Sequence, residues 1–188
     1  MKIDFRQLTM TSIVCGFLLI PVHELGHVIG DWMTGHPAGM SYARDYLLSG
    51  TEKPFLGVLG GPLLPILLSA ISVVLIYRRK NISVLSPIAI LGSFDRLVLY
   101  LGGSLPSDER DLAQMAGWSI SSFKYIFVSV EVILLLLVLL SLFRYKVGFR
   151  QSVFVIVIPL VSFIVGASLG VFVIERYVFP VQFRAQFG

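Results

Sequence analysis

Five long apolar stretches constrain this chain more than any other feature of its sequence. Each is close to the length of about 20 residues that a helix needs to cross a bilayer. A chain in lipid must satisfy its backbone hydrogen bonds internally, so we expect these stretches to be helices. The sequence therefore predicts an all-α integral membrane protein with about five transmembrane helices, at residues 8–33, 55–77, 82–101, 120–143 and 153–173.

Composition supports the membrane class and excludes others. Only 14% of the 188 residues are charged, whereas a soluble domain carries about 25%. We attribute the net charge of +4 mainly to Lys and Arg in cytoplasmic loops, so no nucleic-acid partner is predicted. Cys15 is the single cysteine of the sequence, which excludes an intrachain disulfide and a cysteine zinc site.

The basic residues indicate an orientation. Lys2 and Arg6 precede an apolar stretch that lacks a small-residue cleavage site, so we expect this stretch to be retained as a helix. The basic cluster at 78–80 falls on the same side of the membrane as the N-terminus. Because Lys and Arg collect in cytoplasmic loops, we expect a multi-pass protein of the inner or plasma membrane with a cytoplasmic N-terminus.

The first apolar stretch contains the motif HELGH at residues 23–27. On a helix, His23 and His27 lie one turn apart on the same face and can bind one metal ion together. Glu24 lies beside them and can take a proton from a water bound to that metal. Ionisable side chains inside a membrane are costly, which favours a functional site over chance. Pro21, which has no N–H, is expected to kink or loosen the helix before the motif.

The third ligand has to come from elsewhere in the chain. A catalytic zinc takes three protein ligands and keeps one position for water. Asp95 and Glu131 lie inside apolar stretches, where a polar tie or ion pair between helices is the plainer explanation. The charged segment after the third stretch and the loop after the first offer other donors. The residues alone leave the choice open among His36, Asp108, Glu109 and Asp111.

The segment at 34–53 is polar and rich in glycine, with Tyr42 and Tyr46 in an alternating pattern. It predicts a short hairpin or a re-entrant loop after the first helix. An edge strand there can bind an unwound substrate by backbone pairing. A plain connector is the alternative.

HELGH in a first transmembrane segment, GGPL at 60–63 in the next and an aspartate after a further apolar segment together resemble the site-2 protease family. These proteins are intramembrane zinc metalloproteases. The resemblance covers roughly the first two-thirds of the chain. It implies a three-helix catalytic core within residues 1–118, followed at 119–188 by two more transmembrane helices and an interfacial C-terminal tail.

The resemblance also implies roles for individual residues. In that family two His and one Asp hold the zinc, and the Glu activates water. Asp108 is the preferred match for the Asp, because the preceding Pro106 and Ser107 resemble the family's proline-containing approach; Asp111 is the reserve. The implied site residues are the metal ligands His23, His27 and Asp108, the catalytic Glu24, and, at the substrate, Gly60, Gly61 and Pro62.

Two departures from the family pattern bear on function. Pro65 stands about where the family has an Asn that helps to hold substrate, and Glu109 rather than Gly follows Asp108. The leading prediction is an intramembrane zinc endopeptidase that cleaves transmembrane segments of membrane proteins. The alternative is a non-proteolytic structural or assembly subunit of a larger membrane complex. A metal transporter or sensor is disfavoured, because no acidic ladder follows the other helices.

Overall fold

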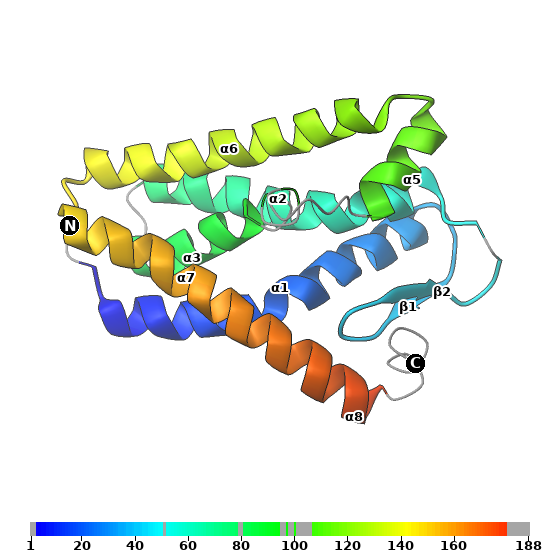
Figure 1. Ribbon diagram of the computed structural model, residues 1–188, viewed down its shortest axis with the longest axis horizontal. Helices are drawn as coiled ribbons and strands as arrows, with labels where there is room; N and C mark the ends of the chain where they lie inside the picture. The colour runs from blue at the N-terminus through cyan, green and yellow to red at the C-terminus, as the bar shows by residue number, and fades with distance from the viewer. Residues whose placement is uncertain are drawn as a thin grey trace.

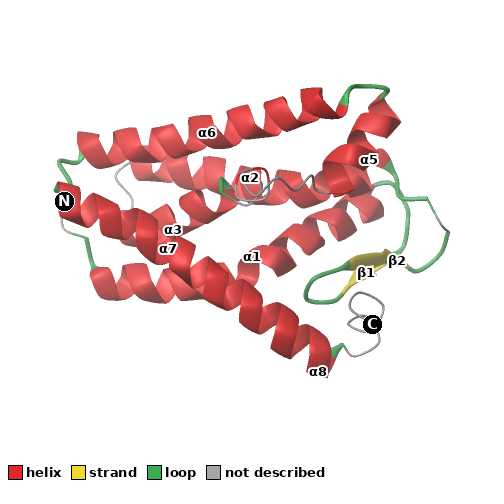
Figure 2. Cartoon of the chain, in the orientation of Figure 1, coloured by secondary structure: helices red, strands yellow, loops and turns green. Residues whose placement is uncertain are grey.

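The computed structural model describes residues 3–50, 52–78, 81–94, 97, 100 and 107–179. Over these residues the chain is nearly all-α, with one short hairpin beside the helices (Figure 1, Figure 2). The helices are α1 (Phe5–Met33), α2 (Phe55–Tyr77), α3 (Ile82–Gly92), α5 (Ser107–Ala116), α6 (Ile120–Arg144) and α7 (Phe149–Leu169), which continues as a π-helical segment η1 (Gly170–Glu175) and α8 (Arg176–Val178); the strands are β1 (Ala38–Met40) and β2 (Asp45–Leu47).

Four helices are long and apolar enough to cross a membrane, namely α1, α2, α6 and the continuous helix from α7 to α8. They correspond to four of the five expected spans. The remaining expected span, 82–101, contains α3, which has 11 residues and ends at Gly92. A helix of this length is too short to cross a bilayer alone. Most of the rest of that span, Asp95 included, lies outside the described residues.

Side-chain caps explain where several helices begin. The carboxylate of Asp4 accepts hydrogen bonds from the N–H groups of Arg6 and Gln7 at the start of α1. The hydroxyl of Ser119 accepts one from the N–H of Ser122 at the start of α6. Such caps satisfy N–H groups that have no partner within the helix.

Helix α1 packs against α2 and against α7 (Figure 1). Glycines allow the close approach on both sides. A side chain at Gly26 would overlap the backbone of Gly60 in α2, and one at Gly16 would overlap the backbone of Ser162 in α7. Buried apolar residues of α1, α2, α3, α6 and α7 join in one hydrophobic core. This packing fixes where α1 presents the HELGH motif.

The hairpin expected after the first helix is present. Strands β1 and β2 pair antiparallel, with Ala38 opposite Leu47 and Met40 opposite Asp45. The turn between them is closed by the N–H of Ser41, which donates to the carbonyl oxygen of Arg44 at 2.7 Å. This register places Asp45 directly after the turn.

Pro21 lies inside α1, which continues through it to Met33 and changes direction along its length (Figure 1). Proline has no N–H, so the carbonyl oxygen of Phe17, four residues earlier, loses its usual helical donor. The hydroxyl of Tyr42 in the hairpin turn donates to this oxygen at 2.6 Å. Tyr42 is only 5% exposed. The hairpin thus supplies the hydrogen bond that the proline removes from α1.

The other side of the hairpin turn is held by the C-terminal helix. The carboxylate of Glu175, in η1, is fully buried. It accepts hydrogen bonds from the hydroxyl of Ser41 at 2.7 Å and from the N–H of Ala43 at 3.2 Å. Gly170 lies against the ring of Tyr42, where any side chain would overlap the ring. The turn is therefore anchored to α1 and η1 together.

Candidate metal centre

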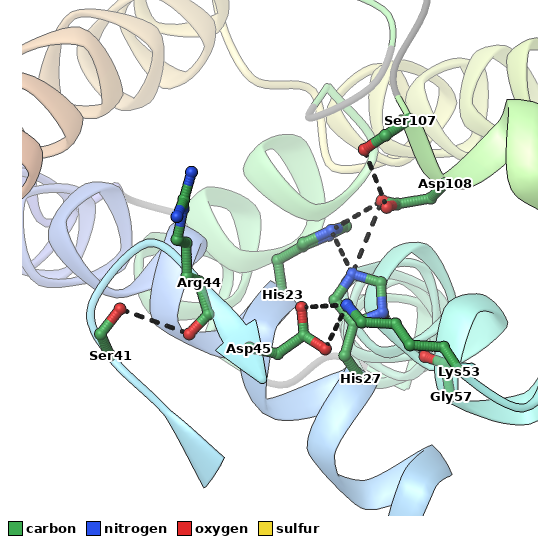
Figure 3. A network of polar contacts seen from close by, with 9 residues as sticks. All are labelled: His23, His27, Ser41, Arg44, Asp45, Lys53, Gly57, Ser107 and Asp108. Atoms are coloured by element: carbon green, nitrogen blue, oxygen red, sulfur yellow. Dashed lines mark hydrogen bonds and ion pairs between the residues drawn. The ribbon is translucent and has the colours of Figure 1, made fainter. Parts of the chain in front are cut away.

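Three side chains from two helices converge beside the HELGH motif (Figure 3). His23 and His27 lie on consecutive turns of α1, and Asp108 is the second residue of α5. The Nε2 atoms of the two histidines are 3.2 Å apart. Oδ2 of Asp108 lies 3.2 Å from Nε2 of His23 and 3.6 Å from Nε2 of His27. The three donor atoms form a nearly equilateral triangle.

The size of this triangle matches one face of a coordination tetrahedron. With bonds of about 2.0–2.1 Å to nitrogen or oxygen, tetrahedral ligand atoms lie about 3.3–3.4 Å apart. The three observed separations bracket that value. Two imidazoles and one carboxylate are also a donor set that suits a catalytic zinc. The residues therefore fit a metal ion with a fourth position left for water.

Helix α2 orients the His27 ring from behind. Nδ1 of His27 lies 2.8 Å from the carbonyl oxygen of Gly57. A carbonyl can only accept, so Nδ1 carries the proton and Nε2 keeps its lone pair toward His23 and Asp108. Gly61 lies against the same ring and leaves no space there for a side chain. His27 is only 3% exposed, so this nitrogen is held in a dry and fixed position.

The helix start of α5 favours the charge on Asp108. A carboxylate in the first turn interacts well with the positive end of the helix dipole. The hydroxyl of Ser107 also lies 3.4 Å from Oδ1 of Asp108. The side chain of Asp108 is 16% exposed and that of His23 is 12% exposed. The triangle is therefore partly exposed on the side of these two residues.

The other candidate donors lie apart from this triangle. Among the described residues, the group of possible ligands around His23 and His27 includes Asp108 but neither Asp111 nor His36. The Nδ1 atom of His36 instead lies 3.1 Å from the hydroxyl of Thr34, in the loop after α1. The structure thus brings together the two histidines and the aspartate that the family resemblance favours.

Glu24 meets a residue that sequence reasoning missed. Carboxylate oxygens of Glu24 and Asp45 and a ring nitrogen of His27 all lie within 4.8 Å of one another. Asp45 is the first residue of β2, and Lys53 forms an ion pair with it at 2.6 Å (Figure 3). Acidic residues are common in polar segments, so the sequence alone does not single out Asp45. The register of the hairpin is what places it near Glu24 and His27.

The GGPL residues lie in the interface between α1 and α2. Gly60 is packed on the backbone of Gly26, Gly61 on the ring of His27, and Pro62 is buried within α2. In this structure Gly60 contacts the backbone of α1 and Gly61 contacts the ring of His27. They position the site from behind.

Asp31, one turn beyond His27, is a second acid that the sequence did not single out. It is fully buried, and its carboxylate lies against Gly57 in the first turn of α2. Within the part of the chain that the structure describes, its oxygens have no hydrogen-bond partner.

Comparisons with protein-family models, with curated proteins and with solved structures find no match to this chain.

Proposed function

We propose that this chain is an intramembrane zinc endopeptidase that cleaves transmembrane segments of membrane proteins. The observation that carries the proposal is the triangle of His23, His27 and Asp108, whose spacing fits a tetrahedral ion. Helix α1, which carries both histidines, packs against α2 and α7, and all three are long and apolar enough to cross a membrane. A metal site with an open position, built on a membrane helix, is suited to hydrolysis within the bilayer.

The chain's own residues divide the work of this reaction. His23, His27 and Asp108 would hold the zinc, which would supply polarisation of the scissile carbonyl and a lowered pKa for a water molecule. Glu24, beside His27, accepts the proton of that water and then donates it to the leaving amide nitrogen. The bond between His27 and Gly57 keeps the ring orientation constant while this happens.

The substrate must be unwound before it is cut, because helical hydrogen bonds shield its peptide bonds. The hairpin lies next to the site and offers strand backbone for pairing with an extended segment. We include this pairing in the proposal, together with a cytoplasmic N-terminus in the inner or plasma membrane.

The proposal is tested by Glu24→Gln in the full chain. We expect the purified variant to keep its zinc, because Glu24 is not a ligand in the triangle. Cleavage of a single-pass transmembrane reporter in proteoliposomes should fall by about a hundredfold or more, because the general base is lost. Glu52→Gln, an exposed residue, is the matched control and should cleave normally. A Glu24→Gln variant as fast as wild type would refute the mechanism.

The second candidate is a non-proteolytic subunit of a larger membrane complex. Pro65 favours it, because this residue is buried and its carbonyl oxygen lies against Gly92 of α3. A proline there offers substrate no side-chain amide, unlike the Asn found at about this place in the site-2 protease family. Metal analysis decides between the two: stable co-purification with partner subunits and no bound zinc would support the subunit function.

A further inference from the structure

Asp45 belongs to a second set of metal-binding atoms that shares His27 with the first. Its carboxylate, that of Glu24 and a ring nitrogen of His27 lie within 4.8 Å of one another. The side chain of Asp45 is only 8% exposed. Two carboxylates and one imidazole suit a divalent first-row metal ion. A second group of possible cation ligands thus lies on the His27 side of the metal centre.

Asp45 is held at this place by the turn before it. The hydroxyl of Tyr42 is bonded to α1, and Ser41 and Ala43 are bonded to the buried carboxylate of Glu175. The last of these anchored residues, Ala43, is only two residues before Asp45 in the sequence. These contacts hold the carboxylate near Glu24, although two nearby negative charges repel each other in a poorly hydrated site.

Asp45 already forms an ion pair with a cationic side chain, that of Lys53. The ammonium group of Lys53 is 2.7 Å from Oδ1 and 2.6 Å from Oδ2 of this aspartate. Lys53 directly precedes Pro54, the residue before α2, so its backbone is tied to the same helix that orients His27. The ammonium contacts both carboxylate oxygens, which are the atoms that a metal ion would need.

We infer that Glu24, His27 and Asp45 form a second, competing cation site, and that the ammonium of Lys53 occupies it. The inference rests on the proposed function and concerns the regulation of the same centre. Nδ1 of His27 donates to Gly57, so Nε2 is its one nitrogen able to bind a metal. An ion in the second site would take this nitrogen and Glu24 away from catalysis. Lys53 keeps both for the first site.

Cobalt(II) binding to the full chain in detergent micelles tests this inference without any cleavage assay. His23→Ala removes a ligand of the first site alone and should weaken cobalt binding by about tenfold or more. Adding Lys53→Met to His23→Ala should raise the cobalt affinity by at least about tenfold, because Asp45 and Glu24 become free to bind the ion. Adding Asp45→Asn to that pair should abolish the gain. Lys53→Arg, which keeps the charge, is the matched control and should give no gain.

Two results would overturn the inference and leave the first metal site standing. One is a His23→Ala/Lys53→Met chain that binds cobalt no better than His23→Ala, with Lys53→Gln giving the same result. The other is a gain that persists after Asp45→Asn. A wild-type chain that binds no cobalt would overturn both the metal centre and this inference. A wild-type chain that binds cobalt but cleaves no reporter would count against the protease alone, and the gain from Lys53→Met would still support the second site.

Discussion

Helix α1 meets α2 backbone to backbone but meets the hairpin through polar side chains. On the α2 side, Gly26 and Gly60 leave no space between the helices. On the hairpin side, the hydroxyl of Tyr42 donates to a carbonyl of α1, and Asp45, which is ion-paired with Lys53, lies near Glu24 and His27. Close packing of two helix backbones cannot adjust when the position of either helix changes. A single polar contact is worth only about 1 kcal/mol, so it can break at small cost.

The difference suggests how the site divides its tasks. The ligand atoms need a fixed geometry, and the glycine interface together with the bond from His27 to Gly57 provides it. In the proposed protease, a substrate would have to enter from a side that can open. The hairpin side fits this role better, because its contacts can break one at a time without loss of the core.

The largest effect is expected from breaking the glycine interface. Gly60→Leu places a side chain where the backbone of α1 lies, so we expect a loss of about 3 kcal/mol of stability or more. Thermal unfolding in detergent, followed by circular dichroism, measures it. Gly148→Leu is the matched control, because Gly148 is exposed and no atom lies close to its Cα on the side where a Cβ would project. Equal unfolding midpoints for the two variants would show that the interface is not close-packed.

The next effect concerns Asp108, the proposed third ligand, which α5 places beside the two histidines. Asp108→Ala removes one corner of the triangle and should lower zinc affinity by about a hundredfold. Asp111→Ala should leave zinc affinity near that of wild type. Competition with a chromophoric chelator gives both affinities. A larger loss for Asp111→Ala would transfer the ligand role to that residue.

The smallest effect is expected on the hairpin side. Tyr42→Phe leaves the carbonyl oxygen of Phe17 without the donor that Tyr42 provides, which should cost about 1–2 kcal/mol of stability. Tyr46→Phe is the control, because Tyr46 is exposed. A Tyr42→Phe chain as stable as the control would show that the turn is not anchored through this hydroxyl.

The same tyrosine predicts a dependence on pH. Burial raises the pKa of Tyr42 from 10.0 to about 12, so the folded state favours the neutral hydroxyl. Its contribution to stability is complete below pH 10 and is lost as the pH rises through 12. The difference in stability between wild type and Tyr42→Phe should therefore be constant below pH 10 and shrink above it. A difference that grows above pH 10 would contradict the buried, neutral hydroxyl.

Long patterns made the fold largely predictable from the sequence. Apolar stretches of the right length identify α1, α2, α6 and α7, and the polar, glycine-rich segment after the first of them contains the hairpin. The third stretch is different. Its apolar character extends to residue 101, yet α3 ends at Gly92 and Ser93 follows as its cap. Hydrophobicity reports the environment of a stretch and does not report where its helix stops.

The site was predictable only where its residues are close in sequence. His23, Glu24 and His27 lie on one helix, so helical geometry alone brings them together. Asp108 and Asp111 lie one turn apart on nearly the same face of α5, so helical geometry does not choose between them and the choice depends on how α5 packs. Asp45 reaches the site through strand register, where a shift of one residue would turn it to the other face.

The hydrogen bond from the hydroxyl of Tyr42 to the carbonyl of Phe17 couples the hairpin turn to the gap that Pro21 leaves in the hydrogen bonding of α1. A proline inside a helix is usually discussed as a cost or a kink. In this chain the carbonyl oxygen of Phe17, which Pro21 leaves without a helical donor, is the acceptor for the hydroxyl of Tyr42 in the hairpin turn. Replacing the proline alone would restore a helical donor to that acceptor and leave the tyrosine competing for it. The two positions therefore behave as one unit, so the effects of changing both should not add up.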